Sequence, residues 1–104
     1  YVSDLSYGQR KLLDLAVAIT KQHSILLLDE PVAGVNPKLR KKISEILNNL
    51  RRKGETILLI EHDMNFVMSI ADYIYVLDYG EVIAQGSPKK IKNNNKVLEA
   101  YLGK

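Results

Sequence analysis

Two short apolar runs, at residues 25–28 and 56–60, flank a longer amphipathic segment, and this order restricts the possible folds more than any other feature of the chain. Each run has the length and aliphatic composition of a β-strand that is buried on both faces. Asn36 followed by Pro37 is a strong helix start, and Gly54 is a good helix stop. A strand, a helix and a strand with short links form a βαβ unit, which requires parallel strands and a right-handed crossover.

Further elements are predicted on both sides of this unit. Ser6 and Gln9 form a capping box at the start of a helix over residues 7–21. The apolar residues that repeat at helical spacing in this helix are Leu12, Leu15, Ala16 and Ile19. After the second strand, the pattern predicts a short helix over 64–71, a hairpin of 73–78 with 81–85 around Tyr79-Gly80, a short helix after Ser87-Pro88 and a last helical turn or two over 96–102.

Composition limits the classes of protein to consider. The chain has 104 residues, at most one domain, and its net charge is +3. It has no apolar run of the roughly 20 residues that a membrane span needs, no secretory leader, and no cysteine, which fits a reducing compartment. Its basic clusters lie in or beside predicted helices without interleaved aromatic residues, so we expect solvated helix faces and no nucleic-acid partner.

Adjacent carboxylates end the first apolar run. Asp29 and Glu30 follow a buried parallel strand, which is where α/β folds place ligands. Asp29 offers the hard oxygen ligand that Mg²⁺ prefers, and Glu30 can polarise an attacking water. The alternative is that both carboxylates only end a strand in solvent. His62 follows the second strand and is expected at the same sheet edge, where an imidazole can hydrogen-bond a phosphate. His23 has no such neighbours and is interpreted as structural.

The start of the first helix is a second candidate site. The free amides and the dipole of a helix N-terminus favour an anion, and here Ser6 adds a hydroxyl while Gly8 keeps the approach path clear. The alternative is a helix cap that only stabilises the fold. No G-x-x-x-x-G-K-[ST] phosphate loop occurs anywhere in the chain. The sequence therefore predicts part of a phosphate-binding site without its main phosphate cradle.

Taken together, these motifs resemble the ATP-binding-cassette (ABC) ATPases across essentially the whole chain. Residues 5–9 resemble the family's signature motif, with Tyr7 where L-S-G-G-Q has its first glycine, and residues 25–30 resemble its Walker B strand. Residues 34–36 resemble the D-loop, where Asn36 replaces the usual aspartate, and His62 resembles the switch histidine. The resemblance implies ATP and Mg²⁺ as cofactors.

The family resemblance also implies a role for each of these residues. Glu30 would be the general base, Asp29 would support Mg²⁺, and His62 would sense the γ-phosphate. The residues implied to contact the nucleotide or the partner domain at the domain interface are Ser6, Gly8, Gln9 and Asn36. Two such domains would sandwich two ATP molecules head to tail, so that Ser6 and Gly8 act in trans.

The resemblance covers residues 1–104 as the C-terminal part of a nucleotide-binding domain. Its implied fold is α/β: a partial P-loop NTPase-type parallel sheet flanked by helices, lacking the phosphate-loop strand, with a C-terminal hairpin and short helices. Segments 31–37, 60–64, 87–91 and 100–103 resemble ATPases of branched-chain amino-acid importers, to which lipopolysaccharide-export ATPases are close relatives. Such a subunit would be cytoplasmic, peripheral on the inner face of the cell membrane and docked on transmembrane permease subunits.

Two other functions remain open at this point. One is a soluble ABC-type ATPase of DNA repair or translation, and the other is a non-catalytic binding module that uses only the helix start or the basic clusters. We expect the isolated chain to be inactive, because the phosphate loop is absent. We also expect it to self-associate, because the missing phosphate-loop strand would leave an apolar edge beside the strand that ends at Ile60.

Overall fold

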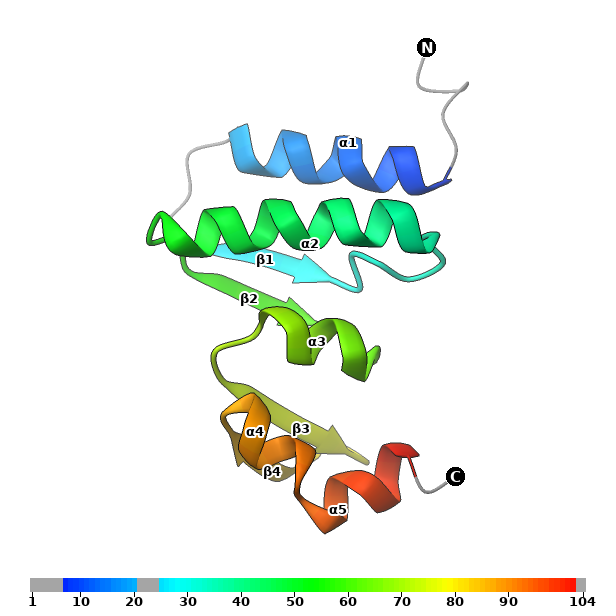
Figure 1. Ribbon diagram of the computed structural model, residues 1–104, viewed down its shortest axis with the longest axis vertical. Helices are drawn as coiled ribbons and strands as arrows, with labels where there is room; N and C mark the ends of the chain where they lie inside the picture. The colour runs from blue at the N-terminus through cyan, green and yellow to red at the C-terminus, as the bar shows by residue number, and fades with distance from the viewer. Residues whose placement is uncertain (1–6, 21–24, 103–104) are drawn as a thin grey trace. The chain divides into compact units, whose positions relative to one another are not determined.

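A computed structural model of the chain describes residues 7–20 and 25–102 (Figure 1). The chain divides into two compact units, Tyr1–Ile70 and Ala71–Lys104. Each unit contains its own two-stranded sheet within the described residues, β1 with β2 in the first and β3 with β4 in the second. The fold is α/β, as predicted.

The first unit contains the predicted βαβ arrangement. Its elements are α1 (Tyr7–Thr20), β1 (Leu26–Asp29), α2 (Pro37–Arg52), β2 (Ile57–Ile60) and α3 (Met64–Ile70). β1 and β2 pair in parallel, in a register that runs from Leu26 opposite Ile57 to Asp29 opposite Ile60. The carboxyl ends of both strands therefore meet at the same edge of the sheet.

The ends of α2 follow the predicted signals. The Asn36 side chain accepts a hydrogen bond from the Leu39 amide at 3.0 Å, which satisfies one of the free amides of the first turn. At the other end Lys53 is the C-cap, and Gly54 takes a φ of +91°, a conformation that suits glycine. α1 begins at Tyr7, and the predicted cap residue Ser6 lies outside the described residues.

The core of the first unit lies on one face of its sheet. Its buried members come from all three helices, from β1 and from the turn after β1: Leu15, Leu26, Val32, Val35, Ile43, Leu47 and Phe66. Partly buried Leu28, Ile57 and Leu59 pack against this cluster. Residues that are directly opposed in the register share a face, so these side chains point with Leu26 toward the helices. In Figure 1, α1 and α2 run side by side above the two strands.

The prediction that both strands are buried on both faces is wrong for the residues that the structure describes. Leu27, Leu58 and Ile60 are 64%, 53% and 60% exposed. They alternate with the core-facing residues along β1 and β2 and so lie on the other face of the sheet. The described helices of this unit pack against the core-facing residues. Ala16, predicted on the apolar face of α1, is also exposed, and Ala18 packs against the core instead.

The second unit is a hairpin followed by short helical segments. Its elements are β3 (Ile74–Asp78), β4 (Glu81–Gly86), α4 (Pro88–Lys92), α5 (Asn95–Val97) and the π-helical turn η2 (Leu98–Leu102). The strands are antiparallel, and Tyr79 and Gly80 both have positive φ, as a two-residue type I′ turn requires. Ile91 and Val97 are buried, so the helical segments contribute apolar side chains to the interior of this unit.

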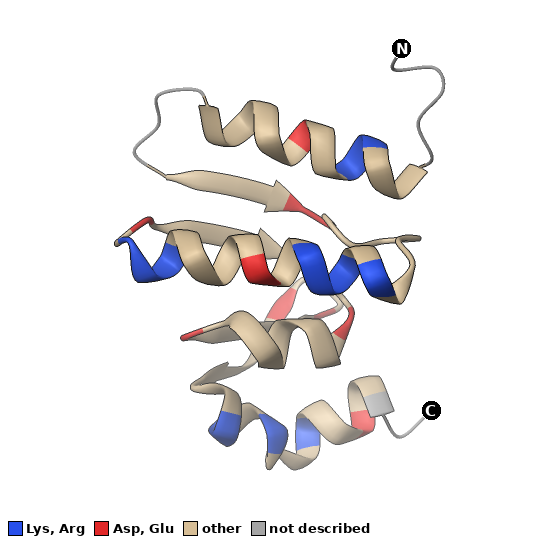
Figure 2. Cartoon of the chain, turned by 45° about the horizontal axis from the view of Figure 1, so that its top comes forward, with Lys and Arg blue, Asp and Glu red and all other residues tan. Residues whose placement is uncertain are grey.

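Positive charge follows helices in each unit. Figure 2 shows the positions of Lys and Arg residues, in blue, along α2 and along α4. The residues of these clusters are mostly exposed, as predicted for solvated helix faces. Among the described residues, no helix is both long and apolar enough to cross a membrane.

Candidate functional site

The ends of β1 and β2 bring the predicted site residues together. Asp29 is the last residue of β1 and lies opposite Ile60, the last residue of β2. The Glu30 amide then donates to the Ile60 carbonyl at 2.7 Å, which extends the pairing by one residue. Glu30 has a φ of +48°, an uncommon conformation for a residue with a side chain. The chain therefore turns sharply where the candidate general base is located.

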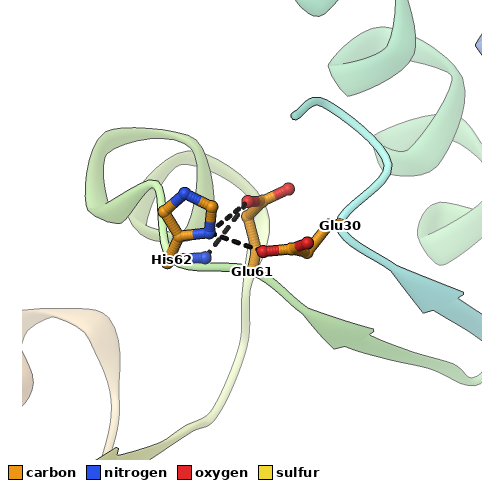
Figure 3. Close-up of side chains that lie close together, drawn as sticks. All are labelled: Glu30, Glu61 and His62. Carbon is orange, nitrogen blue, oxygen red and sulfur yellow. Dashed lines mark hydrogen bonds and ion pairs between the residues drawn. The ribbon is translucent and has the colours of Figure 1, made fainter. Parts of the chain in front are cut away.

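Glu30 and His62 are in direct contact, as their positions after neighbouring strands predicted. His62 Nδ1 lies 2.7 Å from Glu30 Oε1 (Figure 3). Both side chains reach solvent, with exposed fractions of 71% for His62 and 47% for Glu30. A carboxylate and an imidazole in this arrangement can share a proton, and both remain accessible to a water molecule or a phosphate group.

Glu61 is the third member of this cluster and was not among the predicted site residues. Its side chain is only 1% exposed, although it lies beside the exposed side chain of His62. Glu61 Oε1 accepts from the His62 amide at 3.1 Å, and Oε2 accepts from the Val32 amide at 3.4 Å. These two hydrogen bonds depend on contacts that form only in the fold, because the Val32 amide belongs to the turn after the other strand.

The three side chains offer one ligand atom each in a small volume. These atoms of Glu30, Glu61 and His62 all lie within 4.8 Å of one another. Asp29, the predicted Mg²⁺ ligand, is outside this group and is exposed. It follows the alternation of β1 onto the same sheet face as Leu27, the face that the described helices leave uncovered. As a Mg²⁺ ligand, Asp29 would need further oxygen ligands from another group on that face.

The first turn of α1 lies close to the turn that follows β1. Lys11 Nζ donates to the Glu30 carbonyl at 3.1 Å and lies 5.6 Å from the centroid of the Tyr7 ring. A Cβ added at Gly34, whose φ is +70°, would lie 3.2 Å from Tyr7 Cε2. Tyr7, which departs from the signature pattern, therefore packs against the glycine of the D-loop-like segment.

Gly8 has a packing role that its sequence motif did not predict. The residue is buried, and a Cβ at this position would overlap the Leu39 side chain of α2. The missing side chain thus allows α1 to approach α2 closely. That Gly8 also clears a path for an anion stays a prediction.

Gln9 and Asn36, the other predicted interface residues that the structure describes, lie at the surface. Gln9 is exposed on the first turn of α1. Ser6 lies outside the described residues, so the geometry of the capping box is not described. The side-chain oxygen of Asn36 is engaged in capping α2, and Asn36 itself is exposed.

An ion pair fixes the segment that follows His62. Arg40 on α2 pairs with Asp63, and Asp63 Oδ1 accepts from the Phe66 amide at 3.1 Å at the start of α3. The hydrogen bond from Phe66, followed by the contact with Arg40, lowers the pKa of Asp63 from its ordinary value of 3.8 despite the opposing effect of burial. The contacts of Asp63 thus hold the residue after His62 against two helices.

Comparison with known proteins identifies the family. LivG of Escherichia coli, a high-affinity branched-chain amino-acid transport ATP-binding protein, is 49% identical over 102 residues, which cover 97% of this chain and 40% of LivG. BraF of Pseudomonas aeruginosa, which carries the same description, is 45% identical over 100 residues, which cover 95% of this chain and 39% of BraF. The chain belongs to the ABC ATPases. It spans about two fifths of the length of these curated relatives.

Family models and solved structures agree with this assignment. A family model described as "AAA domain, putative AbiEii toxin, Type IV TA system" matches residues 1–69. A model described as a branched-chain amino-acid ATP-binding cassette transporter matches residues 81–104. The structure of MJ1267 in its ADP conformation, an ATP-binding cassette of an ABC transporter, superimposes on this ABC ATPase chain with a TM-score of 0.83 at 36% identity, covering 97% of the chain and 41% of MJ1267.

Proposed function

We propose that this chain forms the C-terminal part of an ABC transporter subunit that hydrolyses ATP to drive transport. The observation that carries the proposal is the 2.7 Å contact between Glu30 and His62 where two parallel strands end. Ligands of open α/β sheets bind beyond the carboxyl ends of the strands. The names of the relatives support an ATP-binding role in transport, since LivG and BraF are both described as transport ATP-binding proteins.

Glu30 acts as the general base in this proposal. Its carboxylate takes a proton from the water that attacks the γ-phosphate, while the imidazole of His62 hydrogen-bonds the γ-phosphate and keeps Glu30 oriented. The direct contact of the two side chains supports this division of roles. A water molecule can reach Glu30, because nearly half of its side-chain surface is exposed.

Asp29 supports Mg²⁺ in the same proposal. Its carboxylate lies on the uncovered sheet face beside the general base, and hard divalent cations bind oxygen ligands. When bound, the ion would neutralise charge on the phosphate groups of ATP. The 104 residues contain no phosphate-loop motif, so we expect that this chain alone neither binds ATP tightly nor hydrolyses it.

The start of α1 serves a second ATP site in trans. In this proposal Ser6, Gly8 and Gln9 contact the γ-phosphate held by a partner ATPase domain in a head-to-tail dimer, and Asn36 lies at the interface between the domains. Free amides at a helix N-terminus favour such an anion. The contacts of Lys11 with Glu30 and of Tyr7 with Gly34 support a link between this helix start and the hydrolytic turn.

Branched-chain amino acids are the proposed transported substrates, and import is the proposed direction. The subunit would dock on transmembrane permease subunits at the cytoplasmic face of the cell membrane. The descriptions of LivG and BraF support the substrate class. The structure of cbiO1 from Clostridium perfringens, 32% identical with a TM-score of 0.78, is described as part of the ABC transporter complex cbiONQ, which supports assembly with other subunits.

Reconstituted transport tests this proposal. The full-length subunit that carries this sequence is assembled with its permease in proteoliposomes, and uptake of labelled leucine is followed with ATP or with a non-hydrolysable analogue. We expect uptake with ATP alone. Hydrolysis without amino-acid uptake would indicate a lipopolysaccharide exporter or a soluble ATPase instead, and the absence of hydrolysis together with salt-sensitive binding to nucleic acid would indicate a binding module.

A further inference from the structure

We propose that Glu61 is a positioning residue of the hydrolytic site, which holds the turn carrying Glu30 and the segment carrying His62 in register. This inference rests on the proposed ATPase function. Glu61 accepts hydrogen bonds from both segments, from the Val32 amide at 3.4 Å and from the His62 amide at 3.1 Å. Figure 3 shows its carboxylate beside the direct contact between Glu30 and the His62 ring.

The burial of Glu61 distinguishes it from its two neighbours. Its side chain is 1% exposed, against 71% for His62 and 47% for Glu30. A buried carboxylate is costly unless hydrogen bonds satisfy it, and bonds from amides to a charged acceptor are stronger than those between neutral groups. A glutamate without a structural role would expose its carboxylate to water. The inward position of the Glu61 carboxylate therefore indicates a role in holding the local backbone.

The turn that Glu61 contacts has a backbone conformation that other contacts must stabilise. Glu30 has a φ of +48°, and such a conformation persists when surrounding contacts fix it. Two turn hydrogen bonds fix it from within, from Ala33 to the Glu30 carbonyl at 3.2 Å and from Val35 to the Val32 carbonyl at 3.1 Å. Glu61 adds a link from β2, and its anchor point Val32 is fully buried in the core.

Glu61 also lies directly behind the reacting pair. Its Oε1 atom is 3.7 Å from His62 Nδ1, and the same nitrogen is 2.7 Å from Glu30 Oε1. Shortening Glu61 would release the His62 amide and the Val32 amide together. Because misplacement of a catalytic group by about 1 Å can cost on the order of 100-fold in rate, the effect should appear in the rate of hydrolysis more than in the affinity for ATP.

Kinetics of Glu61 variants in the full-length subunit test this role. We expect Glu61→Ala to lower kcat by about 10- to 100-fold with an unchanged KM for Mg-ATP. Glu61→Gln should recover part of the loss, because its one carbonyl oxygen still accepts from a backbone amide. Glu45→Ala, at an exposed position on α2, is the matched control and should behave as wild type.

A second background separates positioning from loss of folded protein. In a Glu30→Gln subunit, Glu61→Ala should cause little further loss, because Glu61 acts through the residue already removed. A wild-type kcat in Glu61→Ala, or an equal loss of kcat in both backgrounds, would overturn the role of Glu61 while the ATPase function stands. If wild type itself does not hydrolyse ATP, the proposed function fails, and the role of Glu61 fails with it.

Discussion

At the scale of single residues, the cluster after the two strands shows what the sequence could predict. Glu30 and His62 were expected together because parallel strands end at one sheet edge, and the structure places them 2.7 Å apart. The role of Glu61 could not be predicted in the same way. Whether a carboxylate turns outward to water or inward to two amides depends on the turn on the other strand, which sequence spacing does not determine.

Asp63 carries a pH-dependent prediction. Its pKa is lowered in the folded state, by the hydrogen bond from Phe66 and then by Arg40. The carboxylate therefore stabilises the fold above its ordinary pKa of 3.8, and this contribution is lost as the pH falls below that value and through the lowered pKa. We expect Asp63→Asn to lower the free energy of unfolding by about 1 kcal/mol at neutral pH, since the pair is partly exposed.

Urea unfolding of wild type and Asp63→Asn, at neutral pH and in acid well below the ordinary aspartate pKa, checks this prediction. The difference between the two proteins should shrink in acid. Asp14→Asn, at an exposed position on α1, is the control and should show little difference at either pH. A difference for Asp63→Asn that is equal under both conditions would contradict the assigned role of its charge.

At the scale of elements, local sequence signals predicted where helices begin and end better than they predicted which strand faces are buried. The start of α2 at Pro37 and its end near Gly54 follow from capping and left-handed backbone preferences that act within a few residues. The burial of β1 and β2 was mispredicted. A continuous apolar run indicates that both faces of a strand are suited to burial, but it does not show which segment packs on each face. The uncovered residues Leu27, Leu58 and Ile60 are accordingly exposed.

This uncovered sheet face predicts self-association of the 104-residue chain. Exposed apolar side chains on neighbouring strands form a patch whose exposure to water is unfavourable. Within the described residues β2 pairs only with β1, so its other edge is unpaired there. We expect light scattering to show oligomers at micromolar concentrations, and Leu58→Lys to reduce them. Leu13→Lys, at an exposed position on α1, is the matched control. A monodisperse wild-type monomer would contradict the prediction.

At the scale of the whole molecule, the family assignment determines what this chain contributes. It spans about two fifths of its curated relatives, yet it contains the candidate base, the candidate switch histidine and the segment that resembles the signature motif. The phosphate loop is not among its 104 residues. In the proposed function this chain supplies one part of a composite ATP site, in which Glu30 would activate the water for hydrolysis.

Steady-state ATP hydrolysis by the full-length subunit, compared between wild type and Glu30→Gln, tests the role of Glu30 as the general base. Gln keeps the shape of the side chain but is too weak a base to accept the proton, so we expect the rate to fall by about 10²- to 10⁴-fold while Mg-ATP still binds. Glu45→Gln on α2 is the matched control and should hydrolyse ATP as wild type does. A Glu30→Gln subunit that hydrolyses ATP at the wild-type rate would contradict the account.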